Sequence, residues 1–267
     1  MAAQTVEFSK KHGLAVITLN RPEARNALNP EMVGELGRAI QACRESDVRA
    51  VLFTGSGKAF CAGADVKDFV QQLDDGGPEA LAEHVRRLAG ALHKDVVLGL
   101  RRLDKPVVAA INGVAAGGGF SLMLACDIRI ASSDARFLMA YANIGATADG
   151  GSTYLLPRLV GSAKAMAIYL AGQPISAESA LEMGLVTRVC PAEELEQHSR
   201  EAAMRLAQGP TVAYGRVKAL FNSSWEASLE SQLDAETEWI SNSCLTQDFQ
   251  EGIRAFAEKR QPKFHGA

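Results

Sequence analysis

Hydrophobic and polar positions alternate in short blocks near the start of the chain. Residues 6–8 and 14–19 are apolar-rich and flank a polar Ser-Lys-Lys-His-Gly turn, which predicts a β-hairpin. Asn29 followed by Pro30 is typical of a helix start, with Asn29 as the cap and Pro30 at the first helical position. Residues 50–53 form the next apolar run, of strand type. The opening of the chain therefore mixes strands and a helix.

The middle of the chain continues this alternation. Residues 74–78, Asp-Asp-Gly-Gly-Pro, predict a flexible linker, and residues 79–103 predict a long helix after it. Residues 106–111 are apolar throughout and predict a buried strand. Two further short strands are predicted at residues 128–131 and 137–139. We find no internal repeat of fixed period.

From Gly150 onward the apolar positions recur at helical spacing. This pattern predicts helices at residues 162–170, 176–183, 193–207, 212–221, 229–240 and 249–259. Mixed strands and helices followed by a helical block indicate an α/β fold with a helical C-terminal region. We divide the chain into residues 1–200, the α/β core, and residues 201–267, the helical C-terminal region.

Composition and charge exclude several classes of protein. The chain has 267 residues, of which 47% are hydrophobic, and its net charge is −3. The densest basic stretch is the short group of Arg101, Arg102 and Lys105, whereas nucleic-acid binding needs a broad basic face. No segment has the roughly 18 uninterrupted apolar residues of a membrane span. We therefore expect neither a nucleic-acid partner nor a membrane partner.

Cysteine usage and the N-terminal residues bear on the compartment. The five cysteines are scattered and never form a CxxC pair, so we expect free thiols and neither a disulfide framework nor a metal site. The first seven residues lack the charged and apolar regions of a signal peptide. Together these features predict a cytoplasmic protein. The cysteines are Cys43, Cys61, Cys126, Cys190 and Cys244.

A glycine-rich turn is the first candidate for chemistry. The sequence Ala-Ala-Gly-Gly-Gly-Phe at residues 115–120 joins a predicted buried strand to a predicted helix. Three consecutive glycines permit positive φ and close approach of a ligand, and the helix start presents free N–H groups to it. Phosphate and a developing oxyanion both suit such a site. A tight turn with close helix–strand packing is the alternative, and neither GxGxxG nor a P-loop lysine is present.

A second loop of small residues favours the oxyanion alternative. Residues 59–65, Ala-Phe-Cys-Ala-Gly-Ala-Asp, also follow a predicted strand. An oxyanion hole needs two donors aimed at one oxygen, and each loop could supply one backbone N–H. Asp65 is also placed to cap a helix that begins at Val66, and Cys61, beside the presumed oxyanion hole, is expected to be a packing residue.

These motifs together resemble the crotonase (enoyl-CoA hydratase/isomerase) superfamily. The resemblance covers nearly the whole chain. It is carried by Asn-Arg-Pro at 20–22 with Asn-Ala-Leu at 26–28, the loop at 59–65, Lys-Pro-Val-Val-Ala-Ala-Ile-Asn-Gly at 105–113, Ala-Gly-Gly-Gly at 116–119, Cys-Asp at 126–127, and Gly161 through Val186.

The resemblance implies a fold and an acyl-CoA site. The fold is one of repeated β-β-α units with a helical C-terminal region for trimerisation, and the implied assembly is a homotrimer or a hexamer of two trimers. The two oxyanion donors are implied to be the N–H groups of Ala64 and Gly118. Coenzyme A is implied only as part of the substrate thioester, with no permanently bound cofactor. The residues implied to contact it are Ala24, Ala62, Ala64, Asp65, Val66, Lys263 and Phe264.

The resemblance also identifies the candidate acid/base. Members that hydrate enoyl-CoA use two glutamates, but Ser121 and Tyr141 stand at those positions here. Asp149 stands where dienoyl-CoA isomerases and the epoxide isomerases of phenylacetate breakdown carry a catalytic aspartate. Residues 137–145 and 155–158 resemble those epoxide isomerases most, with Ala148 and Ser152 as departures. Taken alone, Asp149 before two glycines could equally be a helix cap.

One carboxylate suffices for a double-bond shift, so we predict an enoyl-CoA isomerase with Asp149 as acid/base. Three alternatives stay open. A hydratase-like enzyme is one. A 4-chlorobenzoyl-CoA dehalogenase-like enzyme, with Asp149 as nucleophile, also needs a histidine, and His93 lies near that position; we expect His93 to be a surface residue. A non-catalytic acyl-CoA binder is the third. We expect the acyl pocket to include Phe69, Val70, Leu92, Tyr141 and Ile144.

Overall fold

A computed structural model describes residues 4–267, so residues 1–3 of the N-terminal stretch considered above lie outside the described residues. Its larger sheet has six strands in the order β1-β2-β3-β5-β7-β10. Only the β1–β2 hairpin is antiparallel, and the remaining pairs are parallel. The strands are β1 (Val6–Lys11), β2 (Leu14–Leu19), β3 (Ala50–Gly55), β5 (Val107–Ile111), β7 (Ile128–Ser132) and β10 (Arg188–Cys190).

A smaller sheet of four strands, in the order β4-β6-β8-β9, accompanies the first. The pairs β3–β4, β5–β6 and β7–β8 each place one strand in the larger sheet and the next in the smaller one. A helix follows each pair, so the chain repeats a β-β-α unit, as expected from the resemblance. The smaller sheet contains β4 (Ala59–Cys61), β6 (Val114–Ala116), β8 (Arg136–Leu138) and β9 (Ile175–Ser176).

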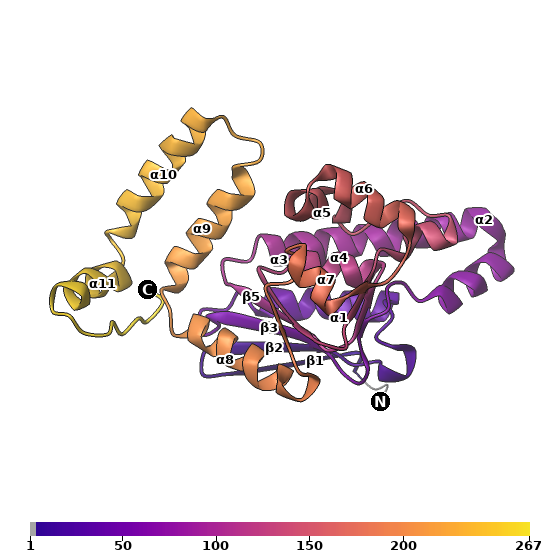
Figure 1. Cartoon of the computed structure of the whole chain (residues 1–267), viewed down its shortest axis with the longest axis horizontal. Helices are drawn as coiled ribbons and strands as arrows, with labels where there is room; N and C mark the ends of the chain where they lie inside the picture. Colours follow the sequence, from indigo (N-terminus) through magenta and orange to yellow (C-terminus); the bar gives the residue numbers. More distant parts are fainter. Residues whose placement is uncertain (1–3) are drawn as a thin grey trace.

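Helices cover the sheets and continue beyond them (Figure 1). The α-helices are α1 (Pro30–Ala42), α2 (Val66–Ala91), α3 (Leu98–Arg101), α4 (Gly118–Leu124), α5 (Ser152–Val160), α6 (Ser162–Ala171), α7 (Ala177–Glu182), α8 (Leu195–Ala207), α9 (Thr211–Ser223), α10 (Leu229–Ser243) and α11 (Gln247–Ala257). Shorter turns are η1 (Pro22–Ala24), η2 (Leu92–Val97, a π-helix), η3 (Ala140–Ile144) and η4 (Ala192–Glu194). None of the helices in residues 4–267 combines the length and apolarity needed to cross a bilayer.

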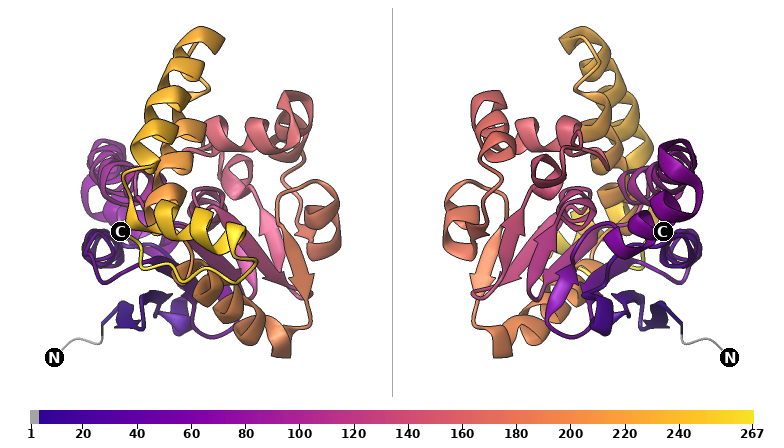
Figure 2. Two further views of the ribbon diagram at one scale, coloured as in Figure 1. Left: turned by 90° about the vertical axis from the view of Figure 1, so that its left-hand side faces the viewer. Right: turned by 90° about the vertical axis from the view of Figure 1, so that its right-hand side faces the viewer.

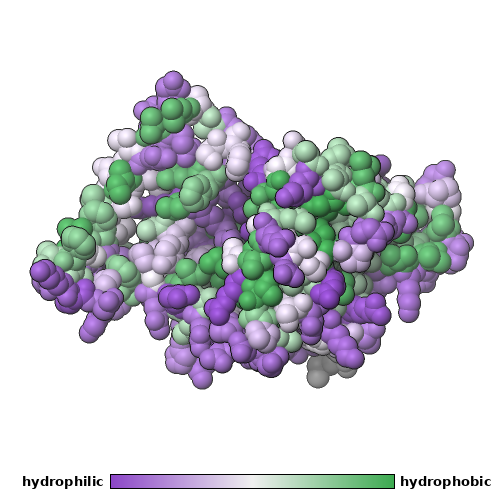
Figure 3. All heavy atoms as spheres, viewed as in Figure 1, coloured by the Kyte–Doolittle hydropathy of each residue, from purple (hydrophilic) through white to green (hydrophobic). Residues whose placement is uncertain are grey.

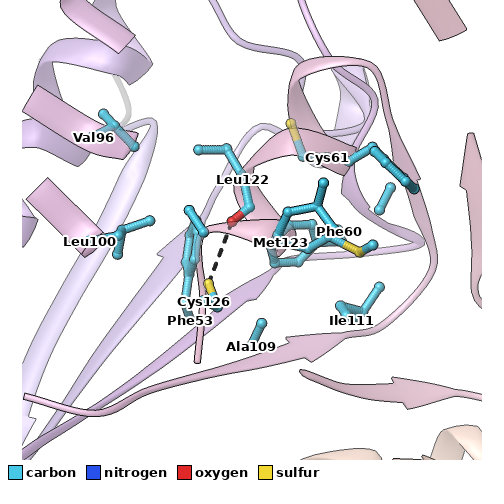
Figure 4. Close-up of a cluster of buried hydrophobic side chains, with 14 of the residues drawn as sticks. Phe53, Phe60, Cys61, Val96, Leu100, Ala109, Ile111, Leu122, Met123 and Cys126 are labelled. Carbon is cyan, nitrogen blue, oxygen red and sulfur yellow. Dashed lines mark hydrogen bonds between the residues drawn. The ribbon is translucent and has the colours of Figure 1, made fainter. Parts of the chain in front are cut away.

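The central strands β3, β5 and β7 of the larger sheet are buried on both faces, and their residues alternate between two cores. Val51 and Phe53 of β3 face the main core, whereas Ala50 and Leu52 face a second core closed by α8. A parallel sheet covered on both sides needs such apolar strands throughout. In the main core, Phe53 meets Phe60 edge to face, with ring centroids 5.2 Å apart (Figure 4). This packing holds the ends of β4 and α4, from which the site is built, in fixed positions.

The predicted hairpin, strands and helix start are confirmed, and the Asn29 side chain accepts a hydrogen bond from the Met32 N–H as a cap. The prediction of a flexible linker at residues 74–78 is wrong. These residues lie within α2, which bends at Gly77, where φ is 75° and ψ is −175°. Gly77 and Pro78 break the helical geometry locally, but helical residues flank them on both sides. The glycines and proline of this segment indicated the bend, but they did not indicate that a helix continues on both sides of it.

The three C-terminal helices α9, α10 and α11 project away from the sheets (Figure 1). In both views of Figure 2 the α9–α10 pair rises beyond the rest of the chain. Helix α8 packs on the larger sheet and crosses residue 200, so the projecting part begins after Ala207. Large apolar side chains are exposed on this part, and apolar surface is visible on it in Figure 3. They include Phe221, Trp225, Leu229, Leu233, Ile240, Ile253 and Phe256.

Candidate functional site

A cavity of about 310 Å³ lies where the two small-residue loops meet the start of α2 and the η3 segment. The predicted residues Ala62, Ala64, Val66, Gly118 and Asp149 all line it. The other lining residues are mainly apolar, which suits an acyl chain. They are Leu28, Val33, Gly63, Phe69, Val85, Leu88, Ala89, Leu92, Gly117, Ala140, Tyr141, Ile144, Ala146 and Thr147.

The two loops approach each other closely at the predicted oxyanion hole. A β-carbon built on Gly63 would lie 3.3 Å from the Gly118 nitrogen, and one built on Gly118 would lie 4.0 Å from the Ala64 nitrogen. Gly63 and Gly117 both have positive φ, 96° and 48°, which side chains rarely tolerate. Glycine is therefore required on both sides of this contact, and it brings the amides of Ala64 and Gly118 to the same wall of the cavity.

The backbone hydrogen bonds around these two amides leave them free. The N–H of Ala62 donates to the Arg25 carbonyl, that of Asp65 to the Leu28 carbonyl, and that of Gly117 to the Leu138 carbonyl. Within residues 4–267, no such backbone acceptor is found for the N–H of Ala64 or of Gly118. Gly118 also begins α4, where N–H groups have no partner inside the helix. Two unpaired donors in one cavity are what an oxyanion hole requires.

Asp149 lines the same cavity, and its carboxylate pairs with an unexpected residue. Its Oδ1 lies 2.6 Å from His93 Nε2. His93 belongs to the π-helical turn η2, a local irregularity that is frequent at functional sites. His93 lies at the surface as expected, with its side chain 45% exposed, but its contact with Asp149 was not expected. No local sequence pattern indicated the pair, because the π-helical turn changes the direction of the side chain from the one expected in an α-helix.

The alternative reading of Asp149 as a helix cap is not supported by its side chain. Gly151, and not Asp149, is the residue at the N-cap position of α5, and no side-chain cap bond is formed there. The Asp149 carbonyl instead accepts from the Ser152 N–H at 3.2 Å. The main chain of Asp149 thus closes the turn, and its carboxylate is left to pair with His93 beside the cavity that Asp149 lines.

Ser121 and Tyr141, the residues at the two glutamate positions, lie beside Asp149. Ser121 Oγ donates to the Asp149 carbonyl at 2.8 Å and lies 2.9 Å from Tyr141 Oη. Burial raises the pKa of the Tyr141 phenol above its ordinary value, although the hydrogen bond with Ser121 acts in the opposite direction. Tyr141 is consequently a neutral donor at physiological pH, and neither side chain supplies a carboxylate.

The residues expected near coenzyme A fall into two groups. Ala62 and Val66 line the cavity, with Asp65 between them and Ala24 in the adjoining turn η1. Asp65 was expected to cap α2, but its side chain makes no cap bond and instead pairs with Arg21 at 3.0 Å. This pair fixes the η1 turn against the start of α2. The Arg21–Asp65 pair and the hydrogen bond from the Ala62 N–H to the Arg25 carbonyl thus hold η1 against the loop that contributes to the cavity, although Ala24 and Asp65 do not line the cavity themselves.

Lys263 and Phe264 lie elsewhere in the described chain. The Lys263 N–H donates to Glu251 at 2.8 Å, and the Phe264 carbonyl accepts from Arg49 at 3.2 Å. Phe264 also packs near Gly252 of α11. Neither residue lines the cavity of its own chain.

Four of the five residues expected to form the acyl pocket, Phe69, Leu92, Tyr141 and Ile144, line the cavity. Val70 does not and is half exposed, since it lies on a different side of α2 from Phe69. Sequence reasoning missed Val85, Leu88 and Ala89 of the second half of α2. Their spacing of three and four positions was a usable signal, but the supposed linker hid the fact that α2 folds back over the site.

Cys61 lies beside the oxyanion hole and is fully buried. Burial raises the pKa of its thiol to about 12. We predict that Cys61 stays unmodified when the folded protein is treated with iodoacetamide near pH 8, because the reactive thiolate is scarce and shielded. Peptide mass spectrometry measures the labelling, with urea-unfolded protein as the control. Rapid labelling of Cys61 in the folded state would contradict its role as a packing residue.

The two sheets, the β-β-α repeat and the small-residue cavity together define the crotonase fold. The sequence pattern of the enoyl-CoA hydratase/isomerase family matches residues 9–267. The chain therefore belongs to the enoyl-CoA hydratase/isomerase family, and it is an enzyme of that kind. This finding argues against a non-catalytic acyl-CoA binder.

Several characterised relatives are similar over their full length. The chain is 40% identical to a 1,2-epoxyphenylacetyl-CoA isomerase of Escherichia coli, over 98% of this chain and 99% of the relative. It is 34% identical to a trans-2-decenoyl-[acyl-carrier-protein] isomerase of Streptococcus mutans, with both chains fully covered. The crystal structure of an enoyl-CoA hydratase from Bacillus anthracis superimposes with a TM-score of 0.90 at 34% identity, covering 99% of this chain and 100% of that one. Relatives thus include both isomerases and hydratases.

Proposed function

We propose that the protein isomerises an enoyl-CoA, by a 3-enoyl to 2-enoyl double-bond shift or by isomerisation of a ring epoxide, with Asp149 as the single acid/base. One observation carries this proposal. Among the residues that line the cavity in the described chain, Asp149 is the only carboxylate, and the unpaired amides of Ala64 and Gly118 line the same space. A base and two fixed donors are the groups that enolate formation requires.

The proposed steps use these groups in turn. The thioester oxygen accepts hydrogen bonds from the Ala64 and Gly118 amides, and the Asp149 carboxylate removes a proton from Cα. Negative charge then moves to the thioester oxygen, where the two amides stabilise it more than they stabilise the neutral carbonyl. Protonated Asp149 returns the proton at the γ-carbon, which completes the shift of the double bond. One carboxylate serves both proton transfers, so no second acid is needed.

Hydration would need a second catalytic group in the site. Water must be activated while Cα is protonated, and hydratases of this superfamily use two carboxylates for these two tasks. Ser121 and Tyr141 occupy the two corresponding positions, and the raised pKa of Tyr141 makes its phenolate scarce. Similarity to two isomerases adds support for isomerisation.

The proposal is tested by mixing the protein with a straight-chain 3-enoyl-CoA and following the absorbance of the conjugated 2-enoyl thioester. We expect absorbance to rise with enzyme concentration. A parallel reaction uses 2-enoyl-CoA and measures hydration by loss of the same absorbance. Fast hydration without isomerisation would overturn the proposal, and an absence of turnover with either substrate or with a ring-epoxide thioester would overturn it as well.

The contact between His93 and Asp149 favours a second candidate. If Asp149 attacked an aromatic acyl-CoA as a nucleophile, a histidine next to it could activate the water that hydrolyses the resulting aryl ester. His93 Nε2 lies within hydrogen-bond distance of the carboxylate, as this route needs. Release of chloride from 4-chlorobenzoyl-CoA, measured with an ion-selective electrode, distinguishes the two functions. We expect none from an isomerase.

Coenzyme A is proposed to enter only as part of the substrate, with no other cofactor and no metal. Ala62 and Val66, which line the cavity, and the neighbouring Ala24 and Asp65 would contact it. Calorimetry with a saturated acyl-CoA and with free coenzyme A measures how much each half of the substrate contributes to binding.

The assembly and location are proposals as well. Residues 1–200 would form the core that carries the site, and residues 201–267 would form the contacts of a homotrimer or of a hexamer of two trimers. The many exposed apolar side chains of α9, α10 and α11 support an interface there, because apolar surface gathered on one part of a protein is costly in water. Lys263 and Phe264 would then reach coenzyme A of a neighbouring copy. We also propose a cytoplasmic location.

A further inference from the structure

We propose that Tyr141, Ser121 and Ser152 form a relay of hydroxyl groups that positions Asp149 and thereby directs the enzyme toward isomerisation. The proposal rests on the function proposed above and goes beyond it, since it gives a task to the two residues at the glutamate positions. They are positioning residues, because their hydrogen bonds reach the main chain of Asp149 and not the reacting atoms.

The hydrogen bonds converge on one atom, the carbonyl oxygen of Asp149. It accepts from Ser152 Oγ at 2.7 Å and from Ser121 Oγ at 2.8 Å, whereas the Ser152 N–H and Tyr141 Oη are both more distant at 3.2 Å. Each hydroxyl has one proton to donate, and a carbonyl oxygen has two lone pairs. The shortest consistent set has Ser121 and Ser152 donating to the carbonyl and Tyr141 donating to Ser121 at 2.9 Å.

Burial makes this relay effective. Ser121 and Ser152 are both fully buried, so water does not replace a lost hydroxyl at either position. Burial also raises the pKa of Tyr141, which keeps its proton available for Ser121. A buried network with every member satisfied holds its groups in one arrangement. With its main chain held, the position of the Asp149 carboxylate depends only on the side-chain torsions of this residue. The contact with His93 restricts those torsions.

The loop geometry requires a small residue at position 121. Gly150 and Gly151 follow Asp149 with positive φ of 62° and 79°. A β-carbon built on Gly150 would lie 2.7 Å from Ser121 Cβ, so the loop passes directly over that serine. A glutamate at position 121 would need the space that the loop occupies. With serine at position 121, the loop can hold Asp149 at the cavity. The site then lacks, at position 121, the carboxylate that hydration would use.

The test compares Ser121→Ala and Tyr141→Phe with the wild type on a 3-enoyl-CoA. Misplacement of a catalytic group by about 1 Å can cost on the order of 10²-fold in rate. We expect kcat to fall by about 10-fold or more in Ser121→Ala and by less in Tyr141→Phe, with KM nearly unchanged. In the Asp149→Asn background, Ser121→Ala should cause no further loss, because residues that act through one group are not additive.

Tyr169→Phe is the matched control. Its hydroxyl donates to the carbonyl of Ala146, in the segment that leads to Asp149, at 2.9 Å, and it makes no hydrogen bond with Asp149 in the described structure. We expect wild-type kcat in this variant. Full kcat in Ser121→Ala would overturn the relay while leaving the isomerase function intact. An equal further loss in the Asp149→Asn background would also overturn it, because Ser121 would then act independently of Asp149.

Hydrogen–deuterium exchange gives a readout that does not depend on turnover. We expect faster exchange in the peptide that contains residues 149–152 in Ser121→Ala and Tyr141→Phe, and wild-type exchange there in Tyr169→Phe. An inactive wild-type protein would defeat the proposed function, and the relay would still be judged by exchange. Unchanged exchange in both relay variants would overturn the relay whatever the reaction.

Discussion

Replacing Asp149 by asparagine is expected to lower isomerase turnover by about 10²–10⁴-fold, the usual contribution of a positioned general base. The amide has nearly the same shape as the carboxylate but cannot accept the proton from Cα. Acyl-CoA affinity should stay nearly intact, because the apolar walls and the Ala64 and Gly118 amides are unaltered. Initial rates with a 3-enoyl-CoA measure the first effect, and calorimetry with a saturated acyl-CoA measures the second.

Asp134→Asn is a suitable control, since Asp134 is exposed in the turn between β7 and β8 and lies outside the cavity lining. It should keep wild-type turnover. Retention of full activity in Asp149→Asn would refute the role of Asp149 as acid/base. Loss of activity together with loss of binding would instead indicate that the substitution had damaged the pocket.

A companion variant, His93→Gln, separates the two candidate functions. In an isomerase, His93 would only restrain the Asp149 carboxylate, so a modest fall in kcat is expected and the product should not change. In the nucleophilic route, loss of His93 should halt hydrolysis after attack and leave an aryl ester on Asp149. Mass spectrometry of the protein after incubation with 4-chlorobenzoyl-CoA detects that ester. Its appearance would favour the second candidate over isomerisation.

Much of the fold was predictable because its signals are local. Asn29 with Pro30 predicted the start of α1, and the uniformly apolar run before the glycine turn predicted β5, which is buried on both faces. The smaller sheet was harder to foresee, since β4, β6 and β8 have only three residues each and periodicity says little over such lengths. The bend at Gly77 was read as a linker, although the helix continues on both sides.

The candidate site, like the fold, was predictable only in part. The two small-residue loops could be located because glycine-rich turns leave a sequence signature. The resemblance to the crotonase superfamily implied the amides of Ala64 and Gly118, and the structure brings both residues to one cavity. The pairing of His93 with Asp149 could not be predicted from the sequence, because it joins residues 56 positions apart through a π-helical turn. The hydroxyls around the Asp149 carbonyl also come from three separate elements. Long-range contacts between side chains depend on packing, which no local pattern encodes.

The substitution Gly119→Ala is expected to impair both catalysis and stability. Gly119 lies against Cys61, the last residue of β4 within the small-residue loop at residues 59–65, and an added β-carbon would overlap the carbonyl oxygen of Cys61 and lie 2.6 Å from Cys61 Cβ. Both residues are buried, so the conflict is relieved only by moving the start of α4 away from the loop. Overpacking of this kind costs about 1–3 kcal/mol of folding free energy. Thermal unfolding followed by circular dichroism measures that loss.

The same movement separates the Gly118 amide from the Ala64 amide, which lies in the opposing loop. Loss of one donor from an oxyanion hole typically lowers kcat by about 10²–10³-fold, and we expect Gly119→Ala to fall in this range at temperatures where it remains folded. Gly90→Ala is the control, because a β-carbon at Gly90 meets nothing within 4 Å and alanine favours the helix. It should keep full activity and unfold at the same or a higher temperature. Wild-type turnover in Gly119→Ala would mean that the two amides do not need to converge, and enolate stabilisation at this site would then have to be abandoned.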